Sequence, residues 1–394
     1  MVKFMSNFFK NLENPNHPLL GPTIWILKIS SMWNEKFNYV QIYAITFQIT
    51  EIVDLWFLRH DSEQALNNLS KSILGFMCIA KSSSFILLHK QWRSVIYFIS
   101  DTEKKQLLQE DRVIHDIMKK YTKYSRLLTY LYWFLAFSTA LALFISPVAK
   151  YSSSSEYRDL IKNGSAPYPE IISSWVPFDK SRGFGYGIVI LLQIMGILYG
   201  SLTVASYDTN AVVIMIFFAG QLEILRVNCK NLFANKKNVL RKFRDCHMHH
   251  VKFTNNYICR YATVFDSVLS PIMFLYVIIC SLMICSSAVQ MTKEGVTTVQ
   301  EIWIAEYIGA LITQLFLYCW HSNQVYSMSL TVSDGVYGSA WWSVDARERR
   351  NVILLAAQLN KTVMFNAGPF TTLSVATFIT IIKGAYSFYT LITR

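Results

Sequence analysis

The chain has 394 residues, of which 53% are hydrophobic, 15% aromatic and only 16% charged, with a formal net charge of +12. A soluble domain usually carries about 25% charged residues, and here the apolar residues gather in runs of about 20 or more, long enough to cross a bilayer as helices. These values argue against a soluble all-α protein. The basic residues cluster between the apolar runs, as membrane topology and anionic lipids favour, and they do not indicate nucleic-acid binding.

Seven apolar runs predict an all-α, seven-transmembrane helical membrane protein. Residues 1–36 show no cleavable signal peptide, so the first span is expected to insert the chain. The second run is interrupted by Lys81 and the three serines after it, and the fourth is so long that it is expected to continue into the cytoplasm past Asp208. The predicted spans are residues 37–58, 72–92, 127–148, 184–217, 264–290, 302–322 and 369–392.

The distribution of Lys and Arg predicts a cytoplasmic N-terminus and an extracellular C-terminus. With this orientation the inner segments hold 26 of the 37 Lys and Arg residues and the outer segments hold 9, and an excess of positive charge marks cytoplasmic loops. The glycosylation sequons at Asn68 and Asn163 fall in predicted outer loops, whereas the one at Asn360 falls inside. The predicted topology is the reverse of that of a G-protein-coupled receptor.

Two segments between the spans have patterns of their own. The outer loop at 149–183 is rich in proline and aromatic residues, which indicates an ordered lid over the helices. Residues 344–365 read as an amphipathic cytoplasmic helix with an apolar side for partner packing. Residues 366–369, Asn-Ala-Gly-Pro, are expected to end that helix, because glycine permits a positive φ and proline can begin the next helix.

The last predicted span is polar for its position. At about 100° per residue, its hydroxyl and glycine positions share one face, and Leu391 interrupts that face at the outer end. Such a stripe fits the wall of a water-filled pore, which an apolar ring can close by dewetting. Alternatively, the hydroxyls bond back to the helix backbone and merely pack against neighbours. The residues of the stripe are Thr377, Thr380, Gly384, Ser387 and Leu391.

The C-terminal part of the sequence resembles the insect odorant receptors. Residues 335–342 (GVYGSAWW) are similar to the sixth-loop signature of that family, and residues 385–391 (AYSFYTL) are similar to its C-terminal tail. The motif-level resemblance covers about the last 60 residues. Over the rest of the chain, the length, the number of spans and the inverted topology match. Between the two motifs, matching positions are Ala367-Gly368, Leu373-Ser374, Phe378 and Ile382-Lys383.

The resemblance implies a ligand-tuning subunit rather than the co-receptor Orco, which is longer through its inner fourth loop. It implies a heterotetramer with Orco around one pore in the plasma membrane of olfactory sensory neurons. A small volatile organic ligand would open this pore to cations, and no catalytic centre, metal or other cofactor is expected. Leu391 would be the hydrophobic gate, with Thr390 beside it. The expected units are a cytoplasmic N-terminal segment (1–36), spans one to six with a ligand-binding outer half (37–322), a cytoplasmic anchor (323–368) and a pore-lining helix (369–394).

The resemblance also places the odorant pocket among spans two, three, four and six. A volatile ligand needs a mostly apolar cavity with a few polar groups, and Gln193 and Tyr307 are the favoured polar candidates because buried polar groups need partners. Each aliphatic candidate also reads as ordinary core. The ionisable residues Lys81 and Glu306 either pair with each other or influence ligand choice; Lys383 stands at the edge of the stripe. The candidate ligand-binding residues are Phe76, Ile79, Ala80, Ser83, Ser138, Leu141, Ala142, Ile145, Gln193, Ile194, Ile197, Glu306, Tyr307 and Ala310.

Other classes of membrane protein remain as alternatives. A homomeric channel of the gustatory type would need no co-receptor, and a metabotropic seven-helix receptor fits the inverted topology poorly. A membrane di-iron enzyme would need several histidine clusters on different helices, and this chain has one, at 247–250. A secondary transporter would show related halves with broken helices, and the sequence shows no clear repeat. The seven cysteines form no close metal pair, and none lies in a predicted outer loop.

Overall fold

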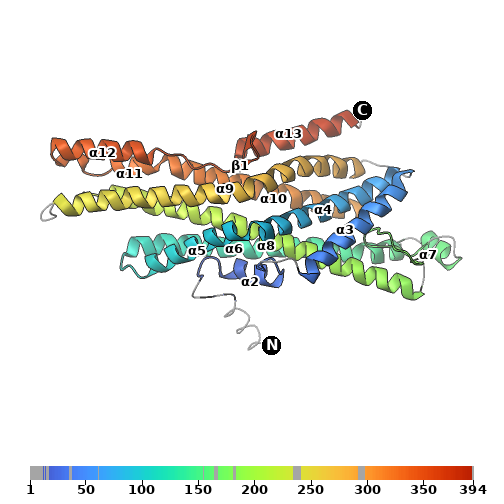
Figure 1. The fold of residues 1–394 in the computed structure, drawn as a ribbon. Helices are drawn as coiled ribbons and strands as arrows, with labels where there is room; N and C mark the ends of the chain where they lie inside the picture. Colours follow the sequence, from blue (N-terminus) through green and yellow to red (C-terminus); the bar gives the residue numbers. More distant parts are fainter. Residues whose placement is uncertain are drawn as a thin grey trace.

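The structure is a computed structural model, and its long helices run along a common axis to form an elongated bundle (Figure 1). The described residues are 12, 14, 17–34, 38–60, 62–153, 155–163, 167–180, 183–233, 241–291 and 298–392. The elements are α2 (Gly21–Ile29), α3 (Tyr39–Phe57), η1 (Leu58–His60), α4 (Ser62–Leu87), α5 (His89–Leu107), α6 (Arg112–Ser153), α7 (Ser155–Lys162), α8 (Gly183–Lys230), α9 (Arg241–Met291), α10 (Thr298–Leu330), α11 (Val332–Tyr337), η2 (Trp341–Ser343), α12 (Ala346–Leu359), β1 (Asn366–Ala367), β2 (Thr371–Thr372) and α13 (Val375–Ile392).

Each predicted span falls on a helix, which confirms the predicted all-α fold. Among the described helices, α6, α8 and α9 are long and apolar enough to cross a membrane by themselves, and α4 with α5 qualifies as one bent pair. The helix α13 is apolar but shorter. Figure 1 shows α11 and α12 at one end of the bundle and α7 at the other; these are called the α12 end and the α7 end below.

The predicted second span, residues 72–92, is not one continuous helix. The helix α4 stops at Leu87, and α5 leaves it at an angle of 75° after Leu88. The corner is held by aromatic packing, since the ring of Trp92 stacks on Phe85 at 4.9 Å and meets Tyr207 of α8 edge-on at 5.5 Å. Trp92 is fully buried, so this tryptophan is a packing residue of the corner rather than the end of a span.

The last helix also begins later than predicted, at Val375 rather than residue 369. Before it, β1 and β2 form a short antiparallel hairpin, in which Gly368 has a φ of +72°. A Cβ atom at Gly368 would lie 2.6 Å from the ring of Phe274 on α9. The positive φ expected at Gly368 is present, but the predicted helix over residues 344–365 already ends at Leu359, so the glycine turns a hairpin rather than ending that helix. The hairpin also keeps Pro369 out of α13, at whose start the Ser374 hydroxyl accepts a hydrogen bond from the amide of Thr377.

The central helix α8 is packed unevenly along its length. From Thr203 to Leu225 every residue except Val204 and Glu223 is buried. From Gly183 to Leu202 only four residues are buried. The dense section faces the middle of the bundle and the α12 end, and the open section runs toward the α7 end (Figure 1). The four buried residues of the open section are Val189, Gln193, Ile197 and Tyr199.

Candidate functional site

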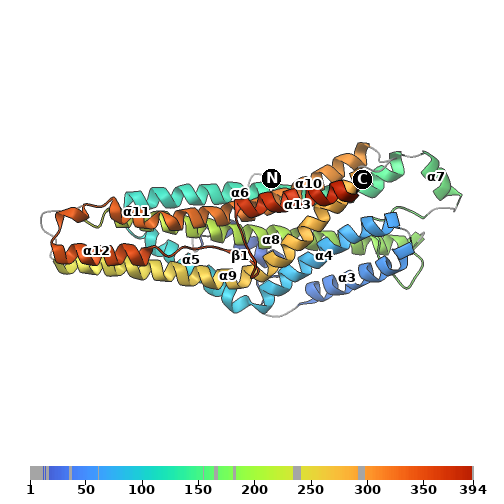
Figure 2. The same ribbon diagram turned by 90° about the horizontal axis from the view of Figure 1, so that it is seen from above.

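The polar stripe of α13 is exposed at Thr380, Ser387 and Leu391 and half-buried at Thr377 and Gly384. The side chain of Ala385 is 2% exposed, and Phe378, Ile381 and Ile382 pack against the core formed with α9 and α10. At about 100° per residue these packed positions centre on a face turned by about 130° from the middle of the stripe. At the far end of the stripe, Leu391 is 73% exposed. Figure 2 shows α13 lying along the bundle surface beside α10.

The hydroxyls of the stripe are bonded to backbone carbonyls. Thr380 donates to the carbonyl of Ala376 at 3.0 Å, and Ser387 donates to that of Lys383 at 2.9 Å. Thr390, which lies beside the stripe, likewise donates to the carbonyl of Ser387 at 2.9 Å. This bonding is what the packing alternative predicts, but Thr380 and Ser387 are exposed on the surface of the described chain.

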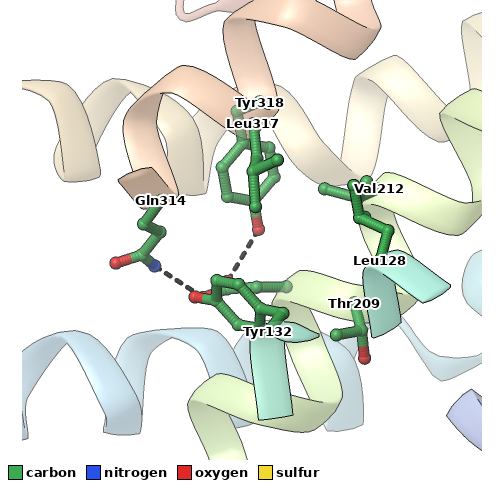
Figure 3. A pocket seen from close by; sticks show the side chains of 8 residues that line it. Leu128, Tyr132, Thr209, Val212, Gln314, Leu317 and Tyr318 are labelled. Atoms are coloured by element: carbon green, nitrogen blue, oxygen red, sulfur yellow. Dashed lines mark hydrogen bonds between the residues drawn. The ribbon is translucent and has the colours of Figure 1, made fainter. Parts of the chain in front are cut away.

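A buried carboxylate joins four helices in the middle of the bundle. One oxygen of Asp208 (α8) accepts from Lys81 Nζ (α4) and from the Tyr318 hydroxyl (α10), both at 2.7 Å. The other accepts from the Tyr132 hydroxyl (α6) at 2.6 Å and from Gln314 Nε2 (α10) at 2.5 Å. Figure 3 shows Tyr132, Gln314 and Tyr318 converging on this point. Four bonds satisfy the carboxylate fully, and both members of the ion pair are 2% exposed.

Of the alternatives for Lys81 and Glu306, pairing with each other is contradicted, because Lys81 pairs with Asp208. Besides Asp208, the ammonium of Lys81 meets the rings of Tyr276 and Tyr207, at 5.2 and 5.8 Å from their centroids. Glu306 instead accepts hydrogen bonds from two hydroxyls of α6. Sequence reasoning treated Asp208 only as the point where a long helix leaves the membrane. The available signal was that Asp208 is the one acidic residue in the run 184–217.

The hollow around Asp208 is filled by side chains. It leaves essentially no room for a water molecule (Figure 3). The arrangement, here called the Asp208 network, therefore fixes α4, α6, α8 and α10 relative to one another and is not a ligand cavity. Its lining residues are Leu128, Tyr132, Asp208, Thr209, Val212, Gln314, Leu317 and Tyr318.

The candidate ligand-binding residues fall into separate groups between the Asp208 network and the α7 end. Ser138 and Glu306 are brought together, because the Ser138 hydroxyl lies 3.3 Å from Glu306 Oε1 and the Thr139 hydroxyl 3.1 Å from the same atom. The hydroxyl of Tyr307 contacts the sulfur of Met283 at 3.8 Å. Phe76, Leu141 and Ile145 lie on exposed faces, at 45%, 56% and 46% exposure. Half-buried positions are taken by Ile79, Ala80, Ser83, Ala142, Ile194 and Ala310.

Gln193 and Ile197 are buried, and both contact the segment that precedes α8. Gln193 is fully buried and bonds with backbone and side-chain groups of residues 170–174. Ile197 shares a hydrophobic cluster with Ile171, Ile172 and Ala140. The expected ordered lid in the outer loop is therefore present over residues 167–180, and Gln193 holds it by hydrogen bonds.

The two predicted glycosylation sites differ in accessibility. The side chain of Asn68 is 4% exposed, so in this conformation it is not open to a glycan. Asn163, which follows α7, is exposed. Glycosylation at either position stays a prediction, and Asn163 is the better supported by the structure.

Comparisons with known proteins agree on one family. The family model described as 7tm Odorant receptor matches residues 61–386. Odorant receptor Or2 of Anopheles gambiae is 20% identical over 359 residues, covering 88% of each chain. Odorant receptor 94a of Drosophila melanogaster is 20% identical over 385 residues, covering 95% of this chain and 94% of the relative.

Solved structures show the same fold. The insect olfactory receptor OR5 from Machilis hrabei in complex with eugenol has a TM-score of 0.79 at 14% identity, covering 95% of this chain and 97% of that one. A second structure of OR5 gives a TM-score of 0.74. This likeness and the long apolar helices make the chain a multi-pass helical membrane protein. Because the family model, which describes receptors rather than enzymes, spans most of the sequence, the chain belongs to the insect odorant receptor family.

Proposed function

We propose that this chain is the odorant-sensing subunit of a ligand-gated, non-selective cation channel that assembles with the co-receptor Orco in the plasma membrane of olfactory sensory neurons. The observation that carries the proposal is the orientation of α13. Thr380, Ser387 and Leu391 of its polar stripe are exposed on the surface of the bundle that holds the helix. One stripe cannot enclose a pore, but several such helices around an axis line one with hydroxyls and close it with an apolar ring.

The α12 end supports assembly with neighbouring subunits. Ile353 and Leu354 of α12 are 61% and 55% exposed, and Trp342 in η2 is 59% exposed. Exposed apolar residues that gather in one region mark interaction sites. The predicted topology places this end in the cytoplasm, so these residues would face other subunits rather than lipid. Orco as the neighbour follows from the family resemblance.

The proposed ligand-binding site is the loosely packed region between the Asp208 network and the α7 end. It combines aliphatic side chains with a few polar groups, among them Ser138, Glu306 and Tyr307, which is the make-up of sites for small organic molecules. The structure of OR5 was determined with eugenol, a small organic ligand. We expect a ligand of that class.

Electrophysiology with and without Orco tests the assembly. An odorant panel is applied to cells expressing this chain alone, Orco alone, or both. We expect odorant-evoked cation current only from the pair. Odorant-evoked current from this chain alone would support the homomeric gustatory-type channel instead, and a G-protein-dependent response without a current of its own would support a metabotropic receptor.

Replacing the apolar residue at the end of the stripe tests the gate. Leu391→Ser should raise the ligand-free current of the complex, because a polar ring no longer dewets the closed pore. Ile379→Ser is the matched control, since Ile379 is an exposed apolar residue of α13 that lies off the stripe. An unchanged basal current for Leu391→Ser, with normal surface expression, would remove Leu391 from the gate.

A further inference from the structure

Residues 167–180, here called the outer strap, cross the α7 end and form hydrogen bonds with α3, α4, α7 and α8. The backbone amide of Trp175 donates to the carbonyl of Thr50 on α3 at 3.1 Å. Lys71 Nζ on α4 donates to the carbonyl of Ile171 at 2.8 Å. The hydroxyls of Tyr157 on α7 and Tyr186 on α8 donate to the carbonyls of Pro167 and Pro169, each at 3.0 Å, and Gln193 on α8 makes further bonds. The strap is therefore an ordered part of the fold, although it has no helix or strand of its own.

Gln193 holds the strap through all the bonding capacity of its amide. Its oxygen accepts from the backbone amides of Ile171 and Ile172 at 3.0 and 3.4 Å. Its nitrogen donates to Glu170 Oε2 at 3.2 Å and to the Ser174 hydroxyl at 3.3 Å. Because the side chain is fully buried, no water replaces these bonds, and losing the amide would leave two strap amides without partners.

Charged groups reinforce the strap at its rim. Lys180 Nζ lies 3.1 Å from Glu170 Oε1 and 3.7 Å from Asp54 Oδ1 of α3, and it donates to the Ser174 carbonyl at 2.8 Å. The Ser173 hydroxyl donates to the second oxygen of Asp54. The Lys180 side chain is 30% exposed, so this ion cluster is screened by solvent and contributes less than the buried amide.

The strap inserts two isoleucines between α6 and α8. Ile171 and Ile172 are 4% and 8% exposed and form a cluster with Ala140 of α6 and Ile197 of α8. Ile194 packs against the same cluster. Ile194 and Ile197 are candidate ligand residues, and Ser138 and Thr139, which bond Glu306, directly precede Ala140 in α6. The two isoleucines thus occupy the α7-end side of the region assigned to the odorant.

We infer that Ile171 and Ile172 form the outer wall of the odorant site and select its ligands by apolar contact, and that Gln193 controls access by holding this wall shut. The inference rests on the proposed function. The surface that the ligand meets is then aliphatic, and Gln193 positions the strap instead of contacting the ligand. An odorant that enters from outside displaces the isoleucine pair and takes its place against Ala140 and Ile197, so the cost of breaking the Gln193 bonds sets the rate of entry.

Cysteine accessibility tests the wall without any odorant. Ile197→Cys is introduced into the full chain, co-expressed with Orco, and labelled at the cell surface with a membrane-impermeant thiol reagent; the chain without the new cysteine gives the background. Labelling should be slow when Gln193 is present and about tenfold faster or more in the Gln193→Met background, because buried hydrogen bonds of about 1 kcal/mol each are lost.

Gln290→Met is the matched control for the accessibility test. Gln290 is a half-buried glutamine of α9 whose nitrogen reaches Ser70 and Ser286, both outside the strap, at 3.4 and 3.5 Å. It should leave the labelling rate of Ile197→Cys unchanged. Equal rates with and without Gln193, or no labelling in either background, would overturn the inference.

Currents test the selectivity. Ile171→Ala and Ile172→Ala should each change the rank order of odorants in favour of bulkier apolar molecules, and Gln193→Met should speed the onset of the odorant response at low concentration. The current evoked by a co-receptor agonist should stay the same in all three. An unchanged rank order and onset would overturn the inference. If the unsubstituted pair responds to the agonist but to no odorant, the proposed function fails, and the labelling rates still decide on the wall.

Discussion

The two sections of α8 differ sharply in packing. Between Gly183 and Leu202 four side chains are buried, and between Thr203 and Leu225 all but two are. A close-packed interior resists rearrangement, whereas regions with few buried contacts supply the moving parts of binding sites. The comparison indicates a rigid half toward the α12 end and an adaptable half toward the α7 end, where the outer strap lies.

Asp208 stands where the two sections meet. A buried ion pair is costly to desolvate, and it is tolerated only when further hydrogen bonds complete it. Here two tyrosines and a glutamine complete it. Because the donors come from α4, α6 and α10, the carboxylate fixes the helices at the border of the rigid half. The adaptable half can then change shape without altering how the rigid half is packed.

The largest effect is expected from breaking this ion pair. Lys81→Met leaves the Asp208 carboxylate buried without a counter-ion, which typically costs about 3–5 kcal/mol. The yield of monodisperse protein at the cell surface or in detergent should fall severely. Adding Asp208→Asn should restore part of it, because the amide is neutral. Lys105→Met is the control: Lys105 pairs with Asp101 on the surface of α5, with 71% of its side chain exposed. A yield for Lys81→Met as high as for Lys105→Met would contradict the rigid-half interpretation.

A glycine in each half gives the next comparison. A Cβ atom at Gly335 of α11 would collide with the carbonyl oxygen of Arg226 on α8 and lie 3.0 Å from Cys229 Cβ. At Gly309 of α10, toward the α7 end, nothing lies within 4 Å of such an atom. Gly335→Ala should therefore destabilise by about 1–3 kcal/mol, and Gly309→Ala should be neutral or stabilise slightly through helix propensity. Thermal unfolding of the purified proteins in detergent measures both, and equal shifts would contradict the comparison.

Hydropathy and charge were enough to predict the helices, but not the contacts that give them their roles. Span length depends mainly on composition, so five of the seven predicted spans each lie on one helix, and the second and the last differ at one end. The bend at Leu88 depends on Trp92 finding Phe85 and Tyr207, and the late start of α13 depends on a hairpin seated on α9. Neither is visible in a pattern that records only local sequence.

Polar residues inside spans show the same limit. Lys81, Gln193 and Glu306 are polar residues inside spans and need partners, but helical periodicity gives the face of a residue and not the neighbour it meets. Lys81 pairs with Asp208, which is 127 positions away, and Gln193 bonds to the backbone of a loop. The signature at residues 335–342 shows the resemblance, but the close approach of Gly335 to α8, its physical reason, depends on the three-dimensional fold.

A conservative change in the adaptable half should alter ligand response and not stability. Tyr307 is half-buried, and its hydroxyl meets only the weak acceptor Met283 Sδ among described side chains. Tyr307→Phe should shift unfolding by no more than about 0.5 kcal/mol and change the odorant rank order of the complex with Orco. The response to a co-receptor agonist should remain. An equal loss of both responses would point to misfolding and would make the adaptable half as sensitive as the rigid one.

A pH-dependent effect is expected at a carboxyl of the rigid half that lies beyond the predicted second span. Burial raises the pKa of Glu103 in α5 from 4.5 to about 7, against the opposing effects of the Leu19 amide, which donates to it at 3.0 Å, and of Arg126. The folded chain thus binds this proton more tightly than the unfolded chain. The contribution of the bound proton to stability is fully present below about pH 4.5 and is lost as the pH rises through about 7.

Glu103→Gln keeps the acceptor for Leu19 and removes the titration. It should flatten the pH dependence of thermal unfolding between about pH 5 and pH 8 and stabilise the alkaline side by at most about 3 kcal/mol. Glu110→Gln, an exposed change just after α5, should leave the profile as it is, so parallel profiles for all three proteins would show that the rigid half holds no buried charge at Glu103.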